Sequence, residues 1–361
     1  MTMTARQFQR QRGFSLVEML AAATVFTIIS LMVVSMTDGI TSAVTSSNQN
    51  LDLDSEARLI FGLLERDLDQ VVSNGAADLQ MIEDDNGTLN DALYFFTESP
   101  AFSDFDTVDT GRYSLVGYRT ATKKNDALAL QFERLGVGLA WDTNTSGSPA
   151  QSDAAIDQMV FVSYDTLNGA VRSQGQIDNR WSTLINTSTV AEDSPFYSVV
   201  GPQIIRFEHC FLLKDGTYSN YPVIPDTLTP STTAPGQQSG QVGDRWFNET
   251  TGRAFICQAI SPPNDPNGNR VWLTHGLEDV AAVVFTVVLL DERSRLIAGD
   301  TNNLIALFPD PTSTELQTVP AELPLQSWTD VVNDPDFAVN AGIPFAAAQN
   351  IKVYQRFIYL D

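Results

Sequence analysis

The sequence predicts an α+β protein in which one long N-terminal helix, first apolar and then amphipathic, packs on a β-rich globular head. Three observations carry this prediction. Residues 16–36 form an apolar run broken by a single charge. Residues 51–72 repeat apolar side chains at spacings of three and four, which is typical of one helix face. After residue 72, short β-branched and aromatic runs alternate with Gly, Asn, Asp and Pro.

The first element is the apolar run, which is long enough to cross a hydrocarbon core of about 30 Å as a helix. Arg6, Arg10 and Arg12 precede it, with no acidic residue before Glu18, so the N-terminus is expected to stay in the cytoplasm. An unpaired carboxylate at membrane depth costs roughly 2.5–3.5 kcal/mol. Glu18 is therefore expected to have both a partner and a function.

The stretch Gly-Phe-Ser-Leu-Val-Glu from Gly13 to Glu18 resembles a type IV prepilin signal. The resemblance implies that prepilin peptidase cuts after Gly13, that the new Phe14 amine is methylated, and that Glu18 is the fifth mature residue. The Glu18 carboxylate would then pair with the Phe14 amine of a neighbouring subunit, which offsets its burial. An ordinary secretory signal peptide is the alternative. Against it, no Ala-x-Ala cleavage site follows Met36, and a plain signal has no use for Glu18.

The same resemblance sets the expected organisation. Residues 1–13 are a leader, 14–37 a transmembrane and assembly helix, 38–74 its amphipathic second half, and 75–361 the head. We expect a single inner-membrane span with a periplasmic head, which later enters a filament or reaches the cell surface. The implied partners are other pilin or pseudopilin subunits, prepilin peptidase and the inner-membrane assembly platform.

The amphipathic half follows a weak segment. Thr, Ser and Asn dominate residues 41–50, and these are poor helix formers, so Gly39 is the natural breakpoint of a long helix. Asn74-Gly75 is the expected stop. The predicted buried face comprises Ala57, Ile60, Phe61, Leu64, Leu68, Val71 and Val72.

The head is predicted to be built from short strands. Residues 280–290 are the strongest candidate, because their valine density and the following Asp-Glu-Arg turn favour a central strand over a buried helix. The run is too short for a second membrane span. The other expected strands are 92–97, 113–120, 127–134, 159–165, 202–213 and 351–360.

Charge and motifs exclude several function classes. The formal charge is −23, and loss of the leader with its three arginines would make it −26. Such a surface repels DNA phosphate, so no nucleic-acid partner is expected. The chain lacks a Gly-x-Ser-x-Gly elbow, a P-loop and a dinucleotide-binding glycine pattern, and neither His209 nor His275 lies at zinc-ligand spacing. We therefore expect no enzymatic activity.

A narrower resemblance rests on two motifs. Glu65-Arg66-Asp67-Leu68 after the long helix, and the hydrophobic strand of residues 284–291, are similar to J-type minor pseudopilins of type II secretion systems. Long prepilin-like proteins of the Verru/Chthon cassette type are another resemblance. Either implies a structural subunit at or near the tip of a type II secretion pseudopilus or a type IV pilus-like filament.

An insertion at about residues 225–275 suggests an alternative function. Its Gly-Asp-x-Trp-aromatic-Asn segment resembles a hairpin of phage tail fibres and of some carbohydrate-active accessory modules. Trp246, Phe247, Phe255 and Trp272 would form a platform for a sugar ring, which would make the chain a filament-tip adhesin. The favoured interpretation is that these aromatic residues form the small core of the hairpin, which has little else to bury.

Two further sets of residues are candidates for cross-linking and metal binding. Cys210 and Cys257 would form a disulfide in an oxidising periplasm, and two free buried thiols are the alternative. No cofactor is expected, because Asx-rich turns are far commoner than calcium loops. Calcium is the alternative at two oxygen-rich turns, with candidate residues Asp84, Asp85, Asp265 and Asn267.

Overall fold

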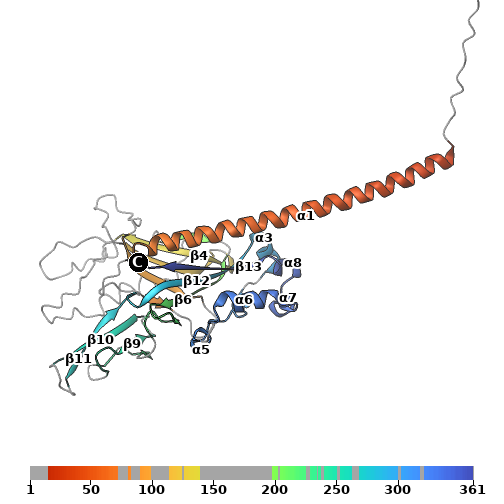
Figure 1. Ribbon diagram of the computed structural model, residues 1–361. Helices are drawn as coiled ribbons and strands as arrows, with labels where there is room; N and C mark the ends of the chain where they lie inside the picture. The colour runs from red at the N-terminus through yellow and green to blue at the C-terminus, as the bar shows by residue number, and fades with distance from the viewer. Residues whose placement is uncertain are drawn as a thin grey trace, which may run out of the picture. The chain divides into compact units, whose positions relative to one another are not determined.

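The chain divides into two compact units, Met1–Leu51 and Asp52–Asp361. Figure 1 shows the computed structural model, in which helix α1 belongs to both units and the strands to the second. The structure describes residues 15–71, 80–82, 90–98, 114–123, 126–138, 197–201, 204–224, 228–233, 235–236, 240–249, 253–261, 268–299, 302–317 and 321–360.

Helix α1 (Leu16–Leu68) confirms the predicted long N-terminal helix. In the described part of the chain it is the one helix long and apolar enough to cross a membrane. The helix is continuous through Gly39 rather than broken there. In the weak segment, the hydroxyls of Thr37, Thr41 and Thr45 donate to carbonyls one turn earlier, so these polar groups are satisfied within the helix.

The second half of α1 buries one face in the second unit. Its buried positions include Ala57, Ile60, Phe61, Leu64 and Leu68 of the predicted face, with Leu53 and Asp67 in addition. The helix ends at Leu68, earlier than the predicted stop, so the half-buried Val71 lies beyond it, and Val72 is outside the described residues. The apolar side chains belong to a single core cluster that also contains residues of all three sheets, such as Phe132, Phe285 and Phe247. The period of the sequence therefore identified the packed face correctly, and the chain has the predicted α+β fold.

A five-stranded sheet follows the helix, with neighbouring strands antiparallel and in sequence order. The predicted strand at 92–97 is confirmed without change, and the predicted strand at 159–165 lies outside the described residues. The strands are β1 (Gln80–Ile82), β2 (Ala92–Thr97), β3 (Ser114–Lys123), β4 (Asp126–Gly138) and β5 (Tyr197–Gly201).

The central sheet has the order β13-β12-β6-β7, with all neighbours antiparallel. Its valine-rich member β12 is almost entirely buried between two long partners, which confirms the prediction of a central strand. The members are β6 (Ile204–Leu213), β7 (Tyr218–Ser219), β12 (Val280–Leu290) and β13 (Ile351–Tyr359).

The hairpin sheet has the order β11-β10-β9-β8, and only its β8–β9 pair is parallel. It occupies the insertion predicted at about 225–275. Its strands are β8 (Leu228–Ser231), β9 (Arg245–Asn248), β10 (Arg253–Ser261) and β11 (Asn269–His275).

A helical insertion, which no sequence pattern had predicted, separates the paired strands β12 and β13. Its own core is formed around Phe308, whose ring contacts those of Trp328 and Phe337. The helices are α3 (Glu292–Ala298), α4 (Asn302–Ile305), α5 (Ser313–Leu316), α6 (Pro324–Asn333), α7 (Phe337–Ala341) and α8 (Phe345–Ala348).

Candidate functional site

The N-terminal site begins with Glu18, because Gly13 and Phe14 lie outside the described residues. The Glu18 backbone N–H donates to Ser15 Oγ (3.2 Å), and the Ser15 N–H donates to Glu18 Oε2 (3.4 Å). This is the reciprocal pattern of a capping box, which satisfies two donors at the helix start. The carboxylate therefore lies at the N-terminal end of α1, where the helix dipole favours negative charge.

The second site is a polar clasp between α1 and the head, built on the motif Glu65-Arg66-Asp67-Leu68. Asp67 is completely buried, and its carboxylate accepts hydrogen bonds from Arg134 Nε (2.6 Å) on β4 and Tyr118 Oη (2.6 Å) on β3. Arg66 adds a third donor from the helix itself (2.9 Å). The apolar helix face thus carries one charge, and the five-stranded sheet supplies its partners.

The environment keeps Asp67 ionised. Burial alone would raise the pKa of this carboxyl, but the hydrogen bonds from Arg134, Tyr118 and Arg66 and the charge of Arg134 outweigh burial and lower it. Burial, together with the neighbouring carboxylate, raises the pKa of the Tyr118 phenol well above its usual value. The phenol therefore stays a hydrogen-bond donor.

Two contacts extend the clasp to the central sheet. Arg356 Nη2 lies 2.6 Å from Glu65 Oε2, and Tyr354 Oη donates to Asp54 Oδ1 at 2.6 Å. Both partners are on β13. We call the contacts of Asp54, Glu65 and Asp67 with these two sheets the helix clasp. They fasten the second half of α1 to two sheets at once.

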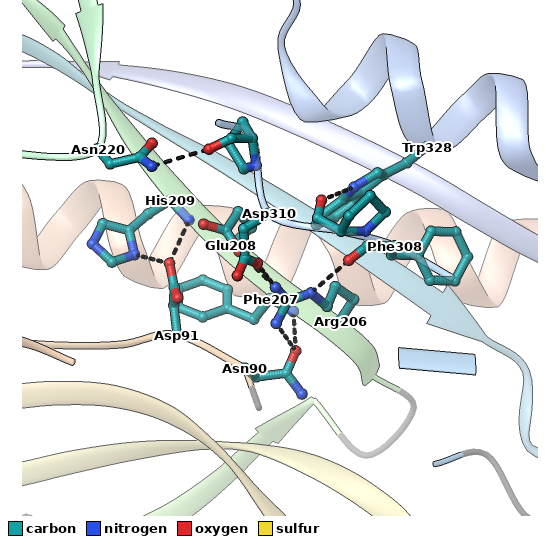
Figure 2. Close-up of polar contacts among 12 residues, drawn as sticks. Asn90, Asp91, Arg206, Phe207, Glu208, His209, Asn220, Phe308, Asp310 and Trp328 are labelled. Atoms are coloured by element: carbon teal, nitrogen blue, oxygen red, sulfur yellow. Dashed lines mark hydrogen bonds and ion pairs between the residues drawn. The ribbon is translucent and has the colours of Figure 1, made fainter. Parts of the chain in front are cut away.

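A third polar group, which the sequence analysis missed, is centred on Arg206 (Figure 2). Arg206 is fully buried and forms ion pairs with Glu208 and Asp310. It also donates to the Phe308 carbonyl (3.2 Å) and to Asn90 Oδ1 (3.3 Å). The Arg206 side chain of β6 thus connects the central sheet to the helical insertion and to Asn90, which precedes β2.

The same group contains a buried histidine. His209 Nδ1 lies 2.8 Å from Asp91 Oδ2, as Figure 2 shows. Burial raises the pKa of Asp91, but the charges of His209 and Arg206 and the hydrogen bonds around it give a net lowering. In sequence, Arg206 and Glu208 alternate with Phe207, as polar residues do on the exposed face of a strand. No feature of the β6 sequence indicated that its polar side chains are buried.

The hairpin aromatics divide between the two faces of their sheet. Trp246 lies opposite Phe255 and Trp272 lies opposite Cys257, so these side chains share one face. The centroids of the Trp246 and Trp272 indole rings are 6.2 Å apart, and the ring planes meet edge to face at 68°. Their Nε1–H groups donate to the carbonyls of Thr233 and Gly236 in the preceding loop.

Phe247 corrects the predicted four-residue platform. Its side chain is buried in the main core against Tyr221, with ring centroids 4.5 Å apart, on the face opposite Trp246. Phe255 is buried as well. Because successive strand residues point to opposite faces, Trp246 and Phe247 cannot line one surface. Phe247 therefore belongs to the main core, whereas Trp246, Phe255 and Trp272 share the other face of the hairpin sheet.

The predicted disulfide is absent, since Cys210 and Cys257 are both free and buried. Cys210 lies on β6 and packs with Val284 and Leu316, whereas Cys257 lies on β10 of the hairpin sheet. The two thiols belong to different sheets and different environments. Burial raises the pKa of both thiols, which keeps them protonated.

The calcium candidates Asp84, Asp85, Asp265 and Asn267 lie outside the described residues. Among the residues that the structure does describe, no three His, Cys, Asp or Glu side chains are grouped as a metal site would require.

Comparison with known proteins adds one finding. Residues 8–34 match the family model of the prokaryotic N-terminal methylation motif. No curated protein and no solved structure matches the chain. The matched segment supports a type IV prepilin-like protein anchored in the inner membrane by its N-terminal helix, and it contains Gly13, Phe14 and Glu18.

Proposed function

We propose that this chain is a minor pilin or pseudopilin, processed by prepilin peptidase after Gly13. It then acts as a structural subunit at or near the tip of a type II secretion pseudopilus or a type IV pilus-like filament. The observation that carries the proposal is the continuity of α1. One helix contains most of the methylation motif and, further along, the residues of the helix clasp.

The proposed tip position is based on the size of the head. A head of about three hundred residues behind one helix hinders close packing of many identical copies, which favours a low-copy place in the filament. The full use of Glu65, Arg66, Asp67 and Leu68 in fastening α1 supports the resemblance to minor pseudopilins on which the narrower assignment rests.

Processing is tested by mass spectrometry of the protein isolated from its native membrane and filament fractions. We expect a mature chain that starts at N-methylated Phe14. An intact Met1 in assembled filaments would overturn the proposal.

Assembly is tested by Glu18→Ala, with Asp38→Ala as a matched control on the exposed surface of the same helix. Glu18→Ala should insert and be cleaved normally but fail to cross-link to other prepilin-like subunits. Asp38→Ala should behave as the unmodified chain does. Equal cross-linking of the two variants would contradict pairing between Glu18 and a neighbouring Phe14 amine.

The alternative proposal, a filament-tip adhesin, rests on the half-buried Trp246 and Trp272 rings lying side by side. It requires glycan binding by the full chain that Trp246→Ala abolishes without unfolding the hairpin sheet. Absence of binding to a glycan array, or loss of binding only through unfolding, would leave the Trp pair with its role in holding the loop of Thr233 and Gly236.

A further inference from the structure

We draw no further inference here: the strongest candidate, the surface patch of exposed apolar side chains on helices α3, α7 and α8 of the helical insertion, carries none, because nothing in the part of the chain that the structure describes shows what covers it.

Discussion

Substitution of Asp67 by Asn tests whether the buried ion pair of the helix clasp holds the head on its helix. The carboxylate is completely buried and accepts two hydrogen bonds of 2.6 Å, from Arg134 and Tyr118. The Arg134 side chain is 9% exposed, so the substitution leaves a largely buried guanidinium without its counter-charge. Breaking one side of a buried pair costs about 3–5 kcal/mol, and we expect the free energy of unfolding to fall by that amount.

The same motif supplies a matched control. Glu65 and Arg356 also form an ion pair at 2.6 Å, but their side chains are 42% and 41% exposed. An exposed pair contributes about 0–1 kcal/mol, so Glu65→Gln should scarcely change stability. The two variants remove one carboxylate charge each, two residues apart on one helix, and differ in burial.

The assay is guanidinium chloride unfolding of the full chain in detergent, followed by circular dichroism. The midpoint should fall for Asp67→Asn at an unchanged denaturant slope, because the slope reports the surface exposed on unfolding. Combining Asp67→Leu with Arg134→Met should recover much of the loss, since both buried charges are then removed. Equal midpoints for Asp67→Asn and Glu65→Gln would refute the reasoning, as would a double variant less stable than Asp67→Asn.

Three further outcomes follow from the same contacts. The folded chain lowers the pKa values of the Asp67, Asp91 and Asp279 carboxyls. The stability that these carboxylates contribute is therefore complete above the unfolded pKa of about 3.9 and is lost as the pH falls through the folded values. Acid titration should accordingly show unfolding below about pH 4. Arg206→Met should remove the buried guanidinium that pairs with Glu208 and Asp310 and cost about 3–5 kcal/mol. Hydrogen exchange should increase in α6 at lower denaturant concentration than in β12. In thermal melts, Gly117→Ala should destabilise the head by about 1–3 kcal/mol, because the added methyl group would overlap the Tyr94 ring, whereas a methyl group on Gly62 of α1 meets nothing.

The elements predicted correctly are those whose burial leaves a period or a composition in the sequence. The buried face of α1 repeats every three to four residues because one side of the helix meets the core. Strand β12 is a continuous valine-rich run because both of its faces are covered. In each case the pattern arises because the element is packed along its whole length, so the local sequence is enough to predict it.

The sequence of the helical insertion has no comparable period or composition. Five of its six helices have four to seven residues, too few for an amphipathic period to emerge from turns and loops. Two local signals were present. Asp291 caps α3 through its side chain, and Gly342 ends α7 in the left-handed conformation. Helix signals without a periodic run between them do not by themselves distinguish a short helix from a turn.

The polar groups were harder still, because their partners are distant in sequence. Asp67 and Arg134 lie on different elements, as do Arg206 and Asp310. Each is an ordinary surface residue type, and a strand or helix that alternates polar and apolar residues predicts that the polar ones face solvent. Burial of these charges is decided by which element packs above them, and only the fold supplies that information.

The clasp has a mechanical consequence that the apolar core alone would not give. The apolar face of α1 repeats nearly identically each turn, so a helix pulled along its axis could slip by one turn and regain most of its hydrophobic contacts. The Asp67–Arg134 pair has no equivalent one turn away, because no carboxylate stands three or four residues from Asp67. Slippage would separate Asp67 from Arg134 and Tyr118 and leave only Arg66, on the same helix, of the three donors described above. Asp67 therefore fixes the register of the second half of α1 against the five-stranded sheet.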